Sequence, residues 1–244
     1  MQPLFSELGP DGRVRPPPNS RLVGQQTMQN QSTATSVSQK AEAILEQAIH
    51  VFAQLGFRGT DVQVIADRAG VGKGTVYRHF GTKEDLFWAA AFEVFKRLRQ
   101  VLIEAERAAV GTVAKLRAAA ITYGRFFDEH PDYLELFIQD RAEFRGTGPE
   151  TYKQEHEALL RYFHAIVERG IAAGEIRPVD SYKCTIALSG LLDGVTMQAC
   201  YLLRGQAMQQ IVEYGVDVFL AGMKLSETAV GSSNPSEPQM SIES

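Results

Sequence analysis

Side chains that donate hydrogen bonds are concentrated in one short stretch of this sequence: Lys73, Thr75, Tyr77, Arg78 and His79. A lysine can donate to the acceptor atoms of guanine, and a threonine methyl group can pack against the methyl group of thymine. Lys73 and Thr75 are therefore candidates for contacts with base edges. By helical angle Arg78 faces away from Thr75, so the sequence leaves open whether Arg78 touches nucleic acid. The stretch as a whole points to recognition of double-stranded DNA.

Two short helices joined by a glycine turn must position these side chains. Apolar residues at helical spacing predict one buried face on a first helix over residues 60–69: Val62, Ile65, Ala66 and Ala69. Gly70 follows, and glycine tolerates the positive φ that a helix exit commonly requires. A second helix over residues 73–80 keeps Val76 and Phe80 on one face. A bracing helix followed by one that enters the major groove is a helix-turn-helix.

The starts of the two helices offer further contacts to DNA. Thr60, with Gln63 three residues later, fits the capping-box pattern. Thr60 and the free N–H groups beside it can bind a phosphate oxygen, or Thr60 serves as the cap alone. Gly72 and Gly74 lack side chains, so the second helix can approach base edges closely. For Gly72, completing the turn is an equal alternative.

The rest of the chain is also predicted to be helical, with no alternating strand pattern. One helix is expected over residues 38–55, capped by Ser38 and ended by Gly56. Thr82, with Asp85 three residues later, begins a long helix that reaches about Ala108. Five more helices are expected: residues 113–130, 131–145, 150–173, 180–203 and 207–225.

The fold class is therefore all-α with about nine helices, divided into four regions. Residues 1–37 are expected to be a disordered extension that either touches DNA as a flexible arm or is a solvated tail. Residues 38–82 form the helix-turn-helix domain, and residues 83–225 form a larger helical domain. Residues 226–244 are expected to be a disordered tail.

The charge distribution restricts the classes of partner. A net charge of −4 and a pI near 5.8 argue against a protein that coats nucleic acid nonspecifically. Residues 38–100 carry a net charge of +2 and residues 101–244 carry −7, so the acidity lies outside the helix-turn-helix. No apolar run approaches the ~20 residues of a membrane span, and no export signal is found. We expect a cytoplasmic protein with no membrane partner.

Cysteine and histidine spacings match no metal site and no catalytic site. Cys184 and Cys200 lie in an apolar helical region and are interpreted as buried reduced thiols or, alternatively, as a redox sensor. The histidines show no HExxH or comparable spacing: His50, His79, His130, His156 and His164. The sequence predicts no catalytic residue, no metal and no other cofactor. An all-helical enzyme or ligand carrier is the less favoured alternative.

The motif resembles the N-terminal domain of TetR/AcrR-family transcriptional regulators. The similarity is carried by three segments: residues 52–60 (FAQLGFRGT), 65–80 (IADRAGVGKGTVYRHF) and 83–86 (KEDL). The resemblance implies that Tyr77, His79 and Lys83 bind phosphates, although His79 can instead be a partly buried structural residue. The chain departs from the family at Asp61, where a second hydroxyl residue is common. An aspartate there favours the helix N-terminus but would repel a nearby phosphate.

The resemblance also implies a homodimer that reads a near-palindromic operator, with residues 83–225 binding a small-molecule effector and forming the dimer. It places the effector cavity among five residues, although aromatic residues at helical spacing are usually plain core: Tyr123, Phe127, Phe137, Phe163 and Met197. Arg141 or His164 can orient a polar end of the effector, or be a surface charge and a satisfied histidine.

The last two helices carry a stripe of small and apolar residues that suits a four-helix dimer interface. Its members are Gly190, Leu191, Gly194, Ile211, Gly215, Val218, Phe219 and Gly222. Packing within one chain is the alternative. The function expected is a DNA-binding transcriptional regulator, namely a repressor released from its operator by a small, largely apolar effector. The alternative is a regulator of the same type gated by a protein partner or by cysteine redox state.

Overall fold

The computed structural model describes residues 20–144, 147–202 and 207–223. These residues form nine α-helices and one π-helical segment, with no strand. The helices are α1 (Ser20–Gly59), α2 (Val62–Arg68), α3 (Lys73–Phe80), α4 (Lys83–Ala108), α5 (Thr112–Glu129), α6 (Pro131–Gln139), α7 (Glu150–Ala172), α8 (Ser181–Leu202) and α9 (Met208–Ala221). The π-helix η1 (Asp140–Phe144) continues directly from α6. The all-α prediction is confirmed. The disorder predicted for both ends of the chain lies mainly outside the described residues.

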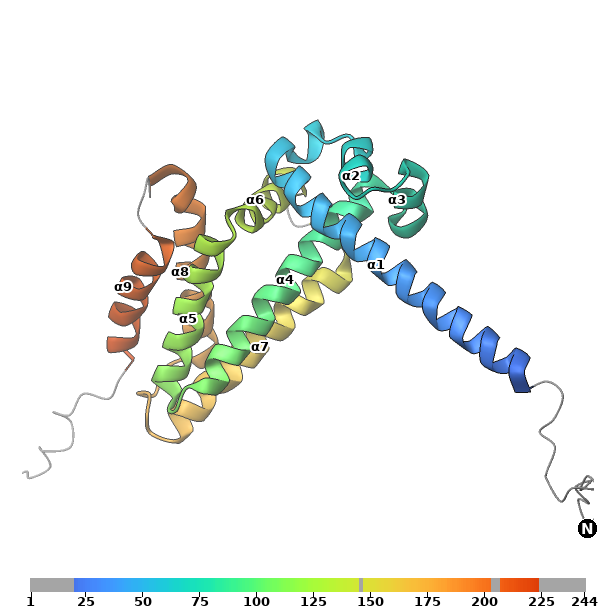
Figure 1. The fold of residues 1–244 in the computed structure, drawn as a ribbon. Helices are drawn as coiled ribbons and strands as arrows, with labels where there is room; N and C mark the ends of the chain where they lie inside the picture. The colour runs from blue at the N-terminus through green and yellow to red at the C-terminus, as the bar shows by residue number, and fades with distance from the viewer. Residues whose placement is uncertain (1–19, 145–146, 203–206, 224–244) are drawn as a thin grey trace, which may run out of the picture.

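The helices form two packed groups (Figure 1). The short helices α2 and α3 pack against α1 and the beginning of α4 at one end of the molecule. Helix α4 then runs out of this group into a bundle with α5, α7, α8 and α9, in which α5 contacts both α4 and α9. Helix α6 and η1 lie where the two groups meet, because α6 packs on α1 as well as on α4 and α5.

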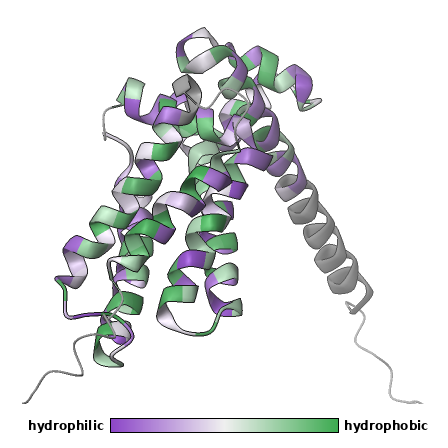
Figure 2. Ribbon diagram, turned by 90° about the vertical axis from the view of Figure 1, so that its left-hand side faces the viewer, coloured by the Kyte–Doolittle hydropathy of each residue, from purple (hydrophilic) through white to green (hydrophobic). Residues whose placement is uncertain are grey.

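Amphipathic faces hold both groups together. Hydrophobic and hydrophilic residues alternate along the helices (Figure 2), and the hydrophobic ones form one continuous buried core. Helix α9, for example, buries Val212, Val216 and Leu220 on a single face. Within the described residues no helix is long and apolar enough to cross a membrane.

The start of the first helix is a correction. The sequence predicts that Ser38 caps a helix after a disordered extension, but α1 begins at Ser20. The Ser38 hydroxyl instead donates to the Glu42 carboxylate, 2.9 Å away and one turn further along the same helix. Residues 20–37 contain no proline, so nothing in the backbone forces the helix to stop before Ser38.

The cap of α2 is a second correction. Thr60 is predicted to cap this helix, but Asp61 does so, because its carboxylate accepts from the Gln63 backbone N–H at 2.8 Å. Aspartate is among the best N-cap residues, so the cap moves by one position. The Thr60 side chain donates to the Gly56 carbonyl at 2.7 Å and closes the end of α1. Gly56 has φ of +70°, as predicted from its place near that end.

Three other predicted signals are confirmed, and one predicted helix is divided. Gly70 has φ of +66° at the turn between α2 and α3. Thr82 and Asp85 form a complete capping box at the start of α4, and α4 ends at Ala108 as expected. The segment expected to be one helix over residues 131–145 is divided into α6 and η1.

Candidate DNA-binding surface and effector cavity

Helix α3 presents the donors that the sequence singles out. Val76 is buried against the core, while Tyr77 is 41% exposed and Arg78 is exposed. Thr75 and His79 are half-buried on the flanks of the helix. These side chains come from consecutive turns of one helix, so the structure places them on one end of the molecule. Their contacts with DNA stay a prediction.

The fold itself does not demand glycine at the start of α3. Gly72 is the N-cap with an ordinary φ of −76°. A Cβ atom added to Gly72 or Gly74 would meet no atom within 4 Å. The absence of side chains therefore serves no packing need within this chain, which favours close approach of an external molecule over completion of the turn.

Lys73 is paired with Asp61 in the free protein. Its ammonium lies 2.8 Å from the Asp61 carboxylate, and the two side chains are 39% and 63% exposed. The Gln63 backbone N–H and the Lys73 ammonium hold the pKa of Asp61 below its usual range. Exposed pairs of this kind are weak, so Lys73 can exchange Asp61 for an acceptor on DNA. Asp61, the residue that departs from the family pattern, thus forms an ion pair with Lys73, the lysine predicted to contact base edges.

Two of the predicted phosphate contacts have other roles in this structure. Thr60 is 4% exposed and its hydroxyl is used within α1, so that hydroxyl is not available to a phosphate. The Lys83 ammonium donates to the backbone carbonyls of Phe57 and Thr60 at 2.9 and 3.1 Å and lies 4.7 Å from the centre of the Phe57 ring. Lys83 therefore holds the C-terminal end of α1, where carbonyl groups lack partners within the helix.

A cavity of about 180 Å³ lies in the helical bundle between α4, α5, α7 and α8. Three of the predicted pocket residues line it: Tyr123, Phe137 and Phe163. The other two do not. Phe127 is 1% exposed and packs edge-on against Tyr123 and Phe137, so it supports the wall from behind. Met197 is half-buried and lies outside the lining.

Polar residues gather in one part of the cavity wall. Arg141, one of the two predicted candidates, lines the cavity and donates to the Asp193 carboxylate at 2.8 Å. The Tyr123 hydroxyl lies 3.4 Å from both Asp193 and Thr196. The second candidate, His164, is not in the lining, because its ring pairs with the Ser181 hydroxyl at 2.9 Å.

The polar wall also contains charged and ionisable residues that the sequence did not single out for the pocket, namely Asp140, His156 and Asp193. His156 is accessible from the cavity, and its ring stacks on Phe95 with centres 3.8 Å apart. Burial among the surrounding helices lowers the pKa of His156 to about 4, so the imidazole is neutral at physiological pH.

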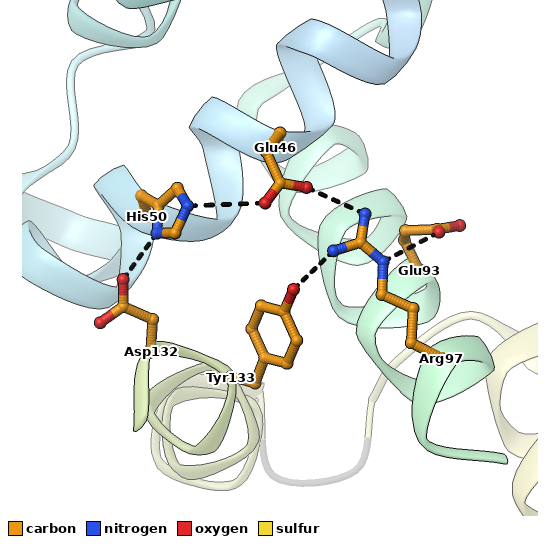
Figure 3. Close-up of polar contacts among 6 residues, drawn as sticks. All are labelled: Glu46, His50, Glu93, Arg97, Asp132 and Tyr133. Atoms are coloured by element: carbon orange, nitrogen blue, oxygen red, sulfur yellow. Dashed lines mark hydrogen bonds and ion pairs between the residues drawn. The ribbon is translucent and has the colours of Figure 1, made fainter. Parts of the chain in front are cut away.

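A network of polar contacts joins the DNA-binding end to the bundle (Figure 3). The Arg97 guanidinium of α4 donates to Glu46 of α1 at 2.9 Å and to the Tyr133 hydroxyl of α6 at 2.6 Å. On the other side of the network, His50 Nδ1 of α1 lies 2.6 Å from the Asp132 carboxylate of α6. Three helices are thus held by charge-assisted hydrogen bonds, which are stronger than neutral ones.

The segment η1 lies between the cavity and the first helix. Asp140 and Arg141, at its start, line the cavity. At its end the Phe144 ring packs 4.9 Å from Phe57 of α1 and 4.8 Å from Trp88 of α4. Single-turn π-helical segments frequently occur at functional sites. This segment of five residues thus lines the cavity at its start and packs on the DNA-binding group at its end.

Helices α8 and α9 expose an apolar face. Tyr214 is 75% exposed and Val218 is 60% exposed on α9, and Tyr182 and Ile186 are exposed on α8. Gly190 and Gly194 have open space around them, whereas a Cβ on Gly215 would come within 3.5 Å of Leu191. Gly215 and Leu191 thus pack within the chain, and the other predicted interface positions stay a prediction.

The alternatives based on cysteine or catalysis gain no support. Burial raises the pKa of the Cys184 thiol, so it forms little reactive thiolate, and its sulfur lies 3.4 Å from that of Met223. The side chain of Cys200 lies outside the described set. Ser181 and Glu168 both approach the same nitrogen of His164, which is not the arrangement of a catalytic triad.

Two family models match this chain. "Bacterial regulatory proteins, tetR family" matches residues 44–95 and "Tetracyclin repressor-like, C-terminal domain" matches residues 109–197. Together the two ranges cover more than half of the 244 residues.

Similar proteins give the same result. The uncharacterized HTH-type transcriptional regulator YhgD of Bacillus subtilis (strain 168) is 31% identical over 142 residues, which span 58% of this chain and 74% of that protein. The fatty acid metabolism regulator protein of the same strain is 30% identical over 138 residues, spanning 55% of this chain and 69% of that protein. The crystal structure of FadR from Bacillus subtilis in complex with stearoyl-CoA has the same fold, with a TM-score of 0.64 and 20% identity over 75% of this chain and 98% of that one. The chain therefore belongs to the TetR family of bacterial transcriptional regulators.

Proposed function

We propose that this regulator is a homodimeric repressor that leaves its operator when a small molecule occupies the cavity in the bundle. The observation that carries the proposal is the physical continuity of η1. One end of η1 lines the cavity through Arg141, and its other end packs on Phe57 of the DNA-binding group through Phe144. A ligand that displaces Arg141 would therefore act on the segment that supports α1.

The DNA-binding part of the proposal rests on α3. Lys73 and Thr75 read base edges, Tyr77 and His79 bind phosphates, and Arg78 contributes from the exposed side of the helix. Because one copy carries little positive charge, two copies are needed for tight binding. In the dimer the two α3 helices lie about 34–36 Å apart, one turn of DNA.

The dimer part rests on the exposed face of α8 and α9. Exposed apolar side chains that are continuous over two neighbouring helices commonly mark an interface. Pairing this face with its copy gives a four-helix interface with two-fold symmetry, which matches a near-palindromic operator. The negative charge of the bundle is then kept away from DNA at the far end of the molecule.

The effector part draws on both the cavity and the relatives. FadR from Bacillus subtilis was crystallised with stearoyl-CoA, so a molecule with a long apolar part is one candidate for this chain. The cavity here, about 180 Å³, suits a smaller apolar body unless the helices separate. Cysteine gating is not favoured, because Cys184 is a poor thiolate.

The test is selection of bound DNA from a random pool with the full chain, followed by a screen for small molecules that release the selected site. We expect a near-palindromic site, and we expect Lys73→Ala to lower affinity and relax preference at the bases that Lys73 reads, by about 1–3 kcal/mol. A compound that acts through the cavity should release the parent protein but not Ser189→Phe, which fills the lining. Failure to enrich any sequence would contradict the proposal.

A further inference from the structure

The cavity wall contains a carboxylate that has no partner. Asp140 lines the cavity at the first position of η1 and is half-buried. Within the part of the chain that the structure describes, no hydrogen bond or ion pair to its carboxylate is found. Burial raises the pKa of Asp140, so burial makes its negative charge costly, and the nearby charge of Arg141 offsets that cost only in part. A ligand that brings a positive charge would relieve that cost.

The neighbouring cation, Arg141, already has an ion-pair partner. The Arg141 guanidinium donates to Asp193 at 2.8 Å, so its charge is matched within the wall. His156, the other basic group in the lining, is neutral at physiological pH. Asp140 and Asp193 against Arg141 leave the lining with an excess of one negative charge.

A second polar group without a hydrogen-bond partner lies beside this wall. Tyr152 is 5% exposed, and its hydroxyl has no hydrogen-bond partner. The Tyr152 ring lies 4.6 Å from the ring of His156, a residue of the cavity lining, so Tyr152 is close to the same part of the wall. Buried polar groups are normally satisfied, and an unsatisfied one beside a cavity points to a partner that is supplied from outside.

Anionic, neutral and cationic head groups would interact with this wall in different ways. A carboxylate or phosphate would have to compete with Asp193 for Arg141 while facing Asp140. A neutral apolar molecule would exclude water from Asp140 and leave its charge uncompensated. A cationic nitrogen would pair with Asp140, and the aromatic rings of Phe95, Phe137 and Phe163 in the lining offer faces on which a cation is attracted.

We propose that the effector of this regulator is a small lipophilic cation, with its apolar body among the aromatic side chains and its cationic nitrogen beside Asp140. This inference rests on the proposed function, since it names the chemical class of the same effector. A cationic effector would also differ in charge from stearoyl-CoA, the negatively charged ligand with which FadR from Bacillus subtilis was crystallised.

The test uses three probes that share one apolar body: 4-phenylbutylamine, 4-phenylbutanol and 4-phenylbutyrate. Calorimetric titration of the full chain at neutral pH should show the ammonium binding about tenfold or more tightly than the carboxylate, with the alcohol between them. Asp140→Asn should reduce the ratio of ammonium to carboxylate affinity to less than about threefold. Asp193→Asn should tighten carboxylate binding, because it frees Arg141.

The matched control is Glu157→Gln. This substitution also removes one negative charge, from an exposed position on α7 next to His156, and it should leave the ratio of affinities unchanged. Tighter binding of the carboxylate by the parent protein, an unchanged ratio in Asp140→Asn, or no binding of any probe would overturn the inference. If the carboxylate binds best and releases the selected DNA, the effector response stands and the cationic class is wrong. If the ammonium binds as expected but the DNA is retained, the cationic class stands and effector-driven release fails.

Discussion

At the scale of residues, we expect single charges around α3 to set how strongly this protein binds DNA. The Asp61 carboxylate pairs with Lys73 and lies at the helix end where a phosphate would approach. Asp61→Asn keeps an N-cap residue but removes the charge. We expect DNA affinity to rise about two- to fivefold, with a steeper dependence on salt concentration. Fluorescence anisotropy at several salt concentrations measures both quantities. Asp67→Asn removes an equal charge from α2 without freeing Lys73, and an equal gain in that variant would refute the role of the pair.

Lys83 acts on stability as well as on any contact with DNA. It donates to two carbonyls at the end of α1 and lies over the Phe57 ring. Lys83→Met keeps the apolar stem but leaves those carbonyls without their donor. We expect the free energy of unfolding to fall by about 1–3 kcal/mol in chemical denaturation. Lys96→Met, an exposed lysine of α4 paired with Glu93, should change it by less than about 0.5 kcal/mol. Equal effects in the two variants would show that the contacts of Lys83 contribute nothing.

At the scale of elements, we propose that η1 connects ligand binding to DNA release. Phe144→Leu keeps an apolar residue but loses the ring contacts with Phe57, Phe87 and Trp88. We expect a loss of about 1–2 kcal/mol in stability, unchanged ligand affinity, and a smaller ratio between DNA dissociation constants with and without effector. Phe126→Leu, in α5, matches the change in volume at another buried position and should preserve the ratio. Full effector response in Phe144→Leu would show that the signal takes another route.

The helices could largely be predicted from sequence, including the two that carry the candidate DNA-binding residues, but the polar wall of the cavity could not. Capping, glycine turns and apolar spacing are local signals, and all of the helix-turn-helix lies within about two dozen residues. Asp140, His156 and Asp193 come together from η1, α7 and α8, so their proximity depends on tertiary packing. The shift of the cap from Thr60 to Asp61 has a local origin instead, since the Thr60 hydroxyl donates to the Gly56 carbonyl four residues earlier and the Asp61 carboxylate accepts from the Gln63 backbone N–H two residues later.

At the scale of the whole molecule, we propose that the exposed face of α8 and α9 forms the dimer interface. Val218→Glu places a charge in the middle of this face, where Val218 is 60% exposed. We expect sedimentation analysis to show a monomer, and operator affinity to fall at least about a hundredfold because the two half-sites are no longer bound together. Val110→Glu is the matched control, since Val110 is 92% exposed between α4 and α5. A dimeric Val218→Glu with the affinity of the parent would refute this interface.

Trp88 is the sole tryptophan of the sequence, and it lies at the junction of the two helical groups. It is 6% exposed and packs against Phe144 at 4.8 Å and Tyr152 at 5.3 Å, while Gly148 lies against the edge of its indole. Its emission therefore reports on one spot only, the place where η1 meets α4. Tryptophan fluorescence of the unlabelled protein, measured without DNA, would therefore show whether a ligand in the cavity moves the support of the DNA-reading helices.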